Sequence, residues 1–561
     1  MRGQDSKRRW ARLAVVATLM MAVTSVHGGS PDFSHTRPKG KRLRPEPLPE
    51  KRPVPPKVRY GTFRPLNEID QFILKRLQDE KVRPNDPCND WDFARRTSLD
   101  LVGIIPRVED LDRFFRWKKK KRRDKWIDLL LAQKQYADHW TTFWGDLLRE
   151  RGRVRGLPEN ALKNVLHQNL LDNRPFDDWV RELMTAEGPA EENPASGFIL
   201  QDRVHANTLT VSISEVFLGV QIRCAECHDH PFDWWTQKDF QGMAGFWDGT
   251  RVRRRAEMQD AKDGARRRPL LEVVTNSRRS RGVFLTGAQS DLGQGPLGLA
   301  DLITRRDNPY FARVAVNRLW QKLMGRGLVN PPSNFSALNP PSHPDLLDWL
   351  AIEFVDSGYD LKHILRLIVS SRTYQQTSSE PKKRRSRSTS SKKTPEENDP
   401  VEGSLFESVV LRRMTAEQIY DSVLAATGHY DSGGRFRPSI ELTYPPRDRS
   451  FLRTFGASDR QTIQSPPLNG SIQQTLTLLN GRFLNGTVRW HPDHPLQQWR
   501  HARGLNVGQL VDALFYQILT RPPTKQERRG ALQYVGNGGF DEAWEDLQWA
   551  LFNSREFQFI R

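Results

Sequence analysis

The chain has 561 residues, of which 37% are hydrophobic and 27% charged, and its formal net charge is +20. This composition excludes a collagen-like, a wholly disordered and a polytopic membrane protein, because only one apolar stretch stands out, at the N-terminus. Three cysteines are too few for a disulfide scaffold, and a chain of this length buries its cores without one.

The N-terminal stretch predicts a secretory signal. A basic run, from Arg2 to Arg12, precedes eleven apolar residues at 13–23 and a small, polar segment. Eleven residues span about 16 Å as a helix, whereas the hydrocarbon core of a bilayer is about 30 Å thick. We therefore expect residues 1–28 to be removed on export. The mature chain is then expected to have no transmembrane span and to be periplasmic, cell-envelope or secreted.

Two basic segments are expected to be disordered linkers. Residues 29–60 include a stretch, 31–56, with eight prolines and seven Lys or Arg, and residues 378–400 contain a Lys, Arg and Ser run. Shorter clusters at 118–123 and 251–255 are expected on solvated faces or loops. No helix-turn-helix, zinc-finger or RNA-binding signature accompanies this charge, so nucleic acid is an unlikely partner and anionic polysaccharide is a better one.

The pattern between these segments predicts a mainly α protein with two helical domains, at 61–270 and 306–560. Apolar residues recur at helical spacing from Ile69 to Leu77, and cap signals open later helices at Ser342, Asp360, Thr415 and Thr524. Strand signals are sparse. The stretch from Val273, continuing through several glycines, predicts a short β or glycine-rich connector at 271–305.

The sequence from Cys224 to His228 reads Cys-x-x-Cys-His, the pattern of covalent c-type haem attachment. One helical turn brings both thiolates to the two vinyl groups, and the adjoining imidazole of His228 then faces the iron. The predicted export of the chain is consistent with this interpretation. Cys224 and Cys227 are therefore predicted to bind haem covalently, with His228 as the iron ligand.

Three other interpretations of the motif stay open. Cys224, Cys227, His228 and His230 have the residue types of a zinc site. An exported Cys-x-x-Cys pair also oxidises readily to a disulfide. The fourth possibility is a packed turn with no cofactor. Cys88 stands alone in the sequence and is interpreted as an incidental thiol in a turn.

A haem would require an apolar wall and a sixth ligand or an open position. The candidate wall is aromatic: Trp234, Trp235, Phe240, Phe246 and Trp247. The candidate sixth ligands are Met243, Met258, Met324 and His205, whereas His230 is too close in sequence to reach the opposite face of the ring.

At this motif the chain resembles exported two-domain proteins of planctomycetes. These carry a cytochrome-c-like planctomycete domain (domain of unknown function 1549) followed by a second planctomycete domain (domain of unknown function 1553). The first resemblance rests on residues 69–74, 95–106, 138–140, 173–177, 183–188, 217–220 and 224–235. The second rests on residues 308–320, 325–329, 339–344, 357–363, 371–374, 478–481 and 553–557. The resemblance implies export and the Cys-x-x-Cys-His site, in families without an established activity.

Polar residues within the stretches that resemble the second domain are candidates for a site of their own: Asn317, Arg318, His343, Asp345, Arg372 and Tyr374. His343 and Asp345 also have a structural interpretation as part of a helix start from Ser342, and Arg318 could pair with a neighbouring acid. No Ser-His-Asp elbow, Walker loop, His-Glu-x-x-His or dinucleotide fingerprint occurs.

The sequence therefore favours electron transfer through a covalently bound haem, with a redox partner protein. A cell-envelope binding or scaffolding protein with zinc or a disulfide at the motif is the alternative. An accessory factor or hydrolase for complex polysaccharide is the second alternative.

Overall fold

The computed structural model describes residues 46–255, 270–379, 405–432, 436–447, 450–463, 470–489, 494–537 and 539–561. This part of the chain is mainly helical with short strands, as the sequence predicted. The predicted signal at 1–28, the first part of the 29–60 linker and most of the 378–400 insert lie outside the described residues. The structure does not test those predictions.

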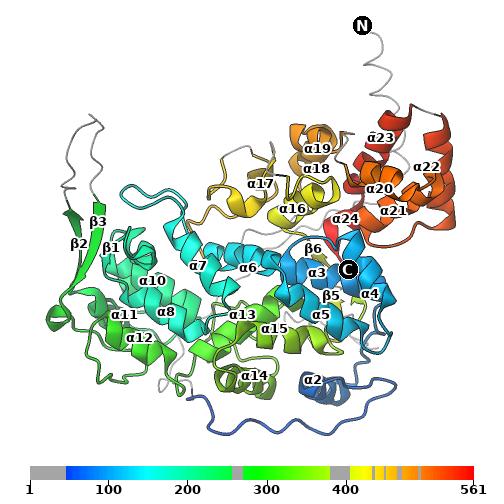
Figure 1. The fold of residues 1–561 in the computed structure, drawn as a ribbon. Coiled ribbons are helices and arrows are strands. Elements are labelled where there is room, and N and C mark those ends of the chain that lie inside the picture. Colours follow the sequence, from blue (N-terminus) through cyan, green and yellow to red (C-terminus); the bar gives the residue numbers. More distant parts are fainter. Residues whose placement is uncertain are drawn as a thin grey trace, which may run out of the picture.

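The first half of the chain forms a run of helices connected by short loops (Figure 1). They are α2 (Glu68–Asp79), α3 (Asp90–Val102), α4 (Val108–Arg116), α5 (Arg122–Ala132), α6 (Lys134–Leu147), α7 (Ala161–Leu171), α8 (Phe176–Thr185), η1 (Pro194–Ser196), α9 (Gly197–Leu200), α10 (Ala206–Phe217), η2 (Arg223–Glu226), α11 (Gln237–Ala244) and η3 (Gly245–Trp247). The periodicity from Ile69 to Leu77 is confirmed, because the predicted apolar face of α2 is buried.

A small antiparallel sheet is formed by one strand from within this run of helices and two strands that follow it. Its strands are β1 (Gly188–Pro189), β2 (Thr250–Arg255) and β3 (Leu270–Thr275), in the order β1-β3-β2, with Thr250 opposite Thr275. The strand predicted from Val273 is thus β3, and its partner β2 lies before the predicted connector. The connector continues through η4 (Ser277–Arg279) into α12 (Pro296–Thr304), so Gly298 lies in a helix.

The centre of the second half is built from α13 (Phe311–Met324), α14 (Pro344–Asp356) and α15 (Leu361–Ser370). The side chain of Asp360 caps α15 by accepting from the backbone N–H of His363, as predicted. The predicted start of α14 at Ser342 is wrong by one residue. His343 is the N-cap residue and Pro344 occupies the first helical position, where its fixed φ suits the helix.

The remaining elements complete the second half. They are β4 (Ser378–Ser379), β5 (Val409–Val410), β6 (Arg412–Arg413), α16 (Ala416–Ala426), η5 (Ser439–Glu441), α17 (Phe451–Thr454), α18 (Ile472–Asn480), α19 (Arg482–Thr487), α20 (Pro495–Arg503), α21 (Val507–Leu519), α22 (Lys525–Asn537), α23 (Phe540–Asn553), α24 (Arg555–Gln558) and β7 (Phe559–Ile560). β4 pairs with β5 in parallel, and β6 pairs with β7 antiparallel. The predicted capping box at Thr415 is present, and Thr524 and Glu527 likewise accept from each other's backbone N–H.

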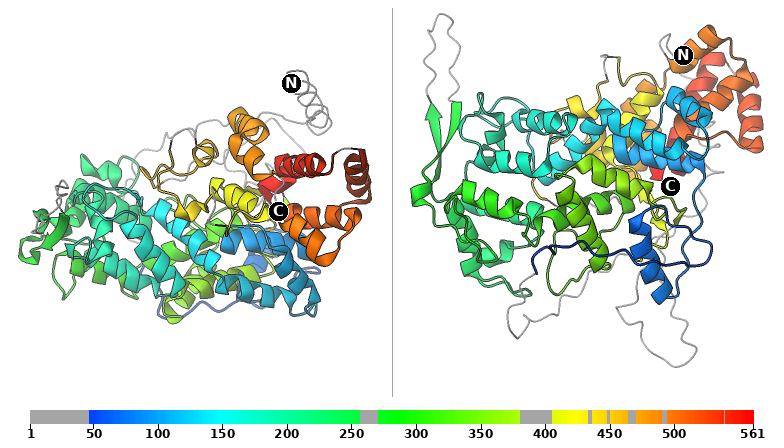
Figure 2. Two further views of the ribbon diagram at one scale, coloured as in Figure 1. Left: turned by 45° about the horizontal axis from the view of Figure 1, so that its top comes forward. Right: turned by 60° about the horizontal axis from the view of Figure 1, so that its bottom comes forward.

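The two halves share one continuous core of buried apolar side chains. Helix α2 packs against α14, α5 against α15 and α10 against α13. The molecule is extended, with the β2–β3 hairpin at one end and helices α20 to α23 at the other (Figure 2). Within the described residues, no helix has both the length and the apolar character to cross a membrane.

The described end of the 29–60 segment is docked on the second half. Leu48 is buried, and Arg52 forms ion pairs with Glu353 and Asp356 of α14. Residues 46–60 therefore lie against the folded body instead of forming a free tether.

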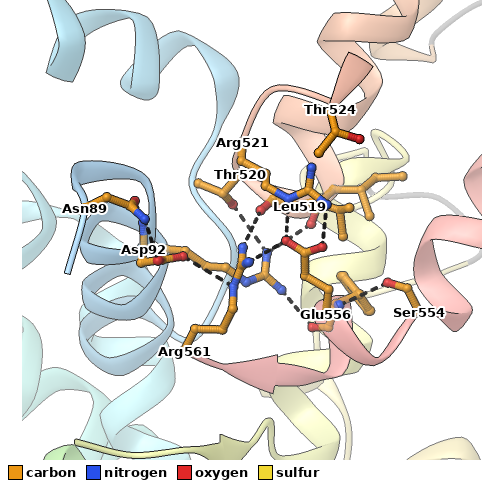
Figure 3. Close-up of polar contacts among 12 residues, drawn as sticks. Asn89, Asp92, Leu519, Thr520, Arg521, Thr524, Ser554, Glu556 and Arg561 are labelled. Carbon is orange, nitrogen blue, oxygen red and sulfur yellow. Dashed lines mark hydrogen bonds and ion pairs between the residues drawn. The ribbon is translucent and has the colours of Figure 1, made fainter. Parts of the chain in front are cut away.

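The C-terminus is tied back to α3 by charged side chains (Figure 3). Glu556 accepts from Arg521 at 2.6 Å and pairs with Arg561 at 2.5 Å, and Arg561 also lies 3.4 Å from Asp92. Beside them the buried Arg95 donates to the carbonyl of Phe557 at 2.7 Å. These contacts join the last residues to the first half of the chain.

The two short basic clusters differ in exposure. Lys118 to Lys121 are exposed, as expected, but Arg122 and Arg123 are half-buried and pair with Asp90 at 3.1 and 2.7 Å. Their placement on a solvated face is therefore wrong for these two arginines. On β2, Arg251, Arg253 and Arg254 are exposed.

A buried carboxyl on α16 predicts a pH dependence of stability. Burial raises the pKa of Asp421 from 3.8 to about 7, although Ser439 donates to it through both its N–H and its hydroxyl. Between these two pKa values the folded protein holds a proton that the unfolded chain releases, so stability falls as pH rises from about 4 to about 7. We expect this fall to be reduced in Asp421→Asn, measured by urea unfolding of both proteins at each pH. If the free energy of unfolding changed with pH in the same way in both proteins, the attribution of this pH dependence to Asp421 would be contradicted.

Candidate cofactor site

The Cys-x-x-Cys-His loop runs from the end of α10 to the start of α11, and a glycine fixes its first turn. Gly219 has φ +63°, and a Cβ at this position would lie 2.6 Å from Cδ2 of Phe335 and 2.8 Å from Cγ2 of Val314. The carbonyl of Gly219 also accepts from the N–H of Phe335 at 2.8 Å. The loop is thus held against α13 and the loop that follows it.

The two motif cysteines lie on one short turn. Cys224 belongs to η2 and Cys227 is the C-cap residue of η2, and residues three apart in a 3-10 helix lie on the same side. Ala225 between them is fully buried, whereas Cys224 and Cys227 are exposed and carry free thiols. Both sulfurs are therefore accessible from solvent.

The imidazole of His228 is exposed and oriented by its neighbour. Nδ1 lies 2.7 Å from the carbonyl of Asp229, which only accepts, so Nδ1 carries a proton. In the neutral ring the lone pair is therefore on Nε2. A hydrogen bond from the other ring nitrogen to a carbonyl oxygen is typical of a histidine that binds a metal.

The first residue of α11, Gln237, holds this turn in place. The N–H of Gln237 donates to the carboxylate of Asp229 at 2.9 Å, and its side-chain amide donates to the carbonyl of Cys227 at 3.1 Å. The sequence analysis did not single out Asp229 or Gln237. The available signal was the capping box of Thr236 and Asp239, which fixes the start of α11 next to the motif.

His230 does not share the arrangement of His228. Its Nδ1 accepts from the backbone N–H of Phe232 at 3.2 Å, so that nitrogen is occupied by the loop itself. Across the described ranges, no group of three or more His, Cys, Asp or Glu side chains lies close enough together to hold a metal ion.

The five candidate wall aromatics divide into two groups. Phe240, Phe246 and Trp247 are buried in the core, so the expectation that they wall a pocket is wrong for them. The ring of Phe246 is covered by the connector, where Gly282 lies directly on it. Trp234 and Trp235 instead line a cavity of about 310 Å³ between the motif loop and the second half of the chain.

Three of the four candidate sixth ligands lie in described parts of the chain. Met243 and Met324 are both 1% exposed and fill the core. His205 is the exposed N-cap residue of α10, and its Nδ1 lies 3.2 Å from the hydroxyl of Thr208. Met258 lies outside the described residues.

Asn317 and Arg318 of α13 make structural contacts. Asn317 is buried and exchanges two hydrogen bonds with the backbone of Val329, at 2.9 and 3.0 Å. Arg318 donates to the carbonyls of Val216 and Glu215 at the end of α10, at 3.1 and 2.5 Å. Its partners are carbonyls, not the acid expected from the sequence, and burial lowers its pKa to about 10.

The other polar candidates from the stretches that resemble the second domain are also dispersed. They are His343, Asp345, Arg372 and Tyr374. His343 is buried, which lowers its pKa to about 3, whereas Asp345 is exposed in the first turn of α14. The hydroxyl of Tyr374 donates to buried Asp100 at 2.7 Å, and the guanidinium of Arg372 lies 5.9 Å from the ring centre of Phe63. These side chains hold segments together and do not surround one cavity.

Family models match two consecutive parts of the chain. Residues 68–252 match PSCyt2, "Protein of unknown function (DUF1549)", and residues 296–535 match PSD1, "Protein of unknown function (DUF1553)". The order of the two domains is the order that the resemblance predicted. No curated protein and no solved structure matches the chain.

Proposed function

We propose that this chain, in which a DUF1549 domain precedes a DUF1553 domain, is an exported electron carrier. Its haem would be bound covalently through Cys224 and Cys227, with His228 as the iron ligand. The observation that carries the proposal is the exposed turn on which two free thiols share one side and an oriented imidazole follows directly.

The thiols meet the requirement of attachment. Each thiol adds across one vinyl group, forming a carbon–sulfur bond while its proton passes to the neighbouring vinyl carbon, so no oxidant is consumed. Attachment requires both sulfurs to be reachable from outside the fold, and both Cys224 and Cys227 are exposed. The buried Ala225 between them anchors the turn without blocking either sulfur.

His228 meets the requirement of an iron ligand. Its Nδ1–H is held by the carbonyl of Asp229, which leaves the Nε2 lone pair for the iron. The bonds from Gln237 to Asp229 and to Cys227 restrain both ends of the ligating segment. A bound haem supplies the one-electron change of its iron, and the exposed position of the motif allows a redox partner to approach.

The geometry favours haem over the zinc and disulfide interpretations. A zinc site at this motif requires His230 as the fourth ligand, but Nδ1 of His230 accepts from the N–H of Phe232, so in the neutral ring its Nε2 carries the proton and has no lone pair for the metal. A disulfide would use both sulfurs and leave the arrangement of His228 without a role.

The test is expression of the full chain in a bacterial periplasm together with a c-type haem maturation system. The mature protein is expected to gain the mass of one haem, to show absorbance bands that change on reduction, and to give a haem-stained band on a denaturing gel. Cys224→Ala with Cys227→Ala is expected to remove the stain. Cys88→Ala, which removes the buried third thiol, is the matched control and is expected to retain it.

Three results would overturn the proposal. They are a matured chain with both thiols free and no visible absorbance, a chain with one zinc ion bound at the motif, and a chain with a disulfide between Cys224 and Cys227. His228→Ala gives a separate check, because covalent attachment is expected to persist while the visible spectrum changes.

A further inference from the structure

A second cavity lies between the two family domains, away from the motif loop. Its volume is about 280 Å³, and its lining comes from α6, α13, β6, α16 and the segment 456–458. In Figure 1, α6 is drawn between α13 and α16, with β6 beside them. The cavity is rich in ionisable side chains: His139, Asp146, Lys322, Arg412, Arg413 and Glu417.

Lys322 is the most unusual of these groups. Within the part of the chain that the structure describes, its ammonium group has no hydrogen bond or ion pair, and it lies 5.8 Å from the ring centre of Phe143. Burial lowers its pKa from 10.5 despite nearby Asp100, Glu417 and Asp146. The exposed fraction of Lys322 is intermediate, and a partly desolvated ammonium group that has no acceptor in the protein is stabilised when a ligand supplies one.

The carboxylates around the cavity are mostly paired with other cations. Arg412 pairs with Asp100 at 2.7 Å, and Arg460, behind the cavity, pairs with Asp146 at 2.9 Å and with Glu150. The remaining carboxylate, Glu417, accepts from the hydroxyl of Tyr444 at 2.9 Å. None of these groups is an ion-pair partner of Lys322.

Arg413 is a second cation without a carboxylate partner among the described residues. Its guanidinium donates to the amide oxygens of Gln474 and Gln558, at 2.5 and 3.3 Å. Of the ionisable side chains that line the cavity, the cations are Lys322, Arg412 and Arg413 and the carboxylates are Asp146 and Glu417, so the lining itself carries one surplus positive charge. The Nε of Arg412 and the Nε2 of His139 are also buried without a partner among the described residues.

We propose that this cavity binds a small anion, with the carboxylate, phosphate or sulfate group held by Lys322 and Arg413. The unpaired donors of the cavity match the acceptor oxygens of such a group, and charge-assisted hydrogen bonds to it are the strong kind. The carboxylate of Glu417 is placed to accept from a hydroxyl or amine on the same ligand. Both family domains contribute to the site, because His139 lies in the first and Lys322 in the second.

The test is calorimetric titration of the full chain with sulfate, inorganic phosphate and malonate, each replacing chloride at constant ionic strength. One of these anions is expected to bind with a stoichiometry of one. Its affinity is expected to fall at least tenfold in Lys322→Met and in Arg413→Gln. Lys362→Met is the matched control, because Lys362 is also half-buried over an aromatic ring, 4.6 Å from the centre of Tyr136, but lies outside the cavity.

A labelling experiment on the unchanged chain covers the case in which a variant fails to fold. Pyridoxal 5′-phosphate condenses with a lysine amine, releasing water, and borohydride reduces the resulting imine to a stable adduct that peptide mass analysis locates. The bound anion is expected to slow labelling of Lys322 at least fivefold and to leave Lys362 unchanged. Equal affinity in Lys322→Met, binding of none of the three anions, or equal protection of both lysines would overturn the proposal.

Discussion

Replacing Arg460 with methionine is expected to lower the free energy of unfolding by about 4 kcal/mol. Arg460 and its partner Glu150 are 2% and 1% exposed, and Arg460 also pairs with Asp146 at 2.9 Å. Burial already raises the pKa of Glu150, and that of Asp146 to about 6, while Arg460 holds both down. Without the guanidinium, the buried carboxyl group of Glu150 and the half-buried one of Asp146 lose their counter-charge, and the ring of Tyr444 loses its contact at 4.1 Å.

The control for this effect is Arg305→Met. Arg305 forms an ion pair with Asp307 at 3.2 Å, but their side chains are 41% and 63% exposed. An ion pair of this kind contributes about 1 kcal/mol or less because water screens it. Urea unfolding of both variants measures the difference. Equal losses for the two variants would show that the buried network does not hold the fold.

Replacing Asp70 with alanine is expected to lower the free energy of unfolding by about 4 kcal/mol, because the carboxylate of Asp70 joins two distant segments. The side chain is fully buried on α2. It accepts from the backbone N–H of Leu66 at 2.8 Å, from the N–H groups of Arg372 and Thr373 at 2.9 Å, and from the Thr373 hydroxyl at 2.8 Å. Removal of the carboxylate leaves several buried donors without an acceptor, and each costs about 1 to 3 kcal/mol before relaxation.

Two measurements separate this role from simple loss of packing. Asp70→Asn keeps one acceptor oxygen and is expected to cost about half as much as Asp70→Ala. In hydrogen exchange, the amides of Arg372 and Thr373, just beyond the end of α15, are expected to lose protection in Asp70→Ala before those of α15 do. A uniform loss of protection along α15 would contradict the local role of this carboxylate.

Much of the helical architecture was predictable from the sequence, because the forces that start and stop a helix act over a few residues. The apolar spacing from Ile69 to Leu77 predicted α2, and the caps at Asp360 and Thr415 predicted the starts of α15 and α16. Ser342 was the exception. Its hydroxyl lies 3.1 Å from Nδ1 of His343, and Pro344 fixes the helix start one residue later.

The candidate cofactor site was predictable in composition but only partly in geometry. The spacing of Cys224, Cys227 and His228 is a local property, and the structure places all three on one exposed segment. The aromatic wall was not predictable. Whether Phe246 lines a pocket or fills the core depends on Gly282, which the connector brings against its ring.

The sequence by itself determined the mainly helical class, the order of the two family domains and the Cys-x-x-Cys-His motif. Only the tertiary structure decided which charges are buried and which of them lack a partner. Asp70 meets Thr373, Arg460 meets Glu150, and Lys322 meets Phe143, across separations of well over a hundred residues. Burial and counter-charge are properties of such distant neighbours, and no local pattern of residue types encodes them.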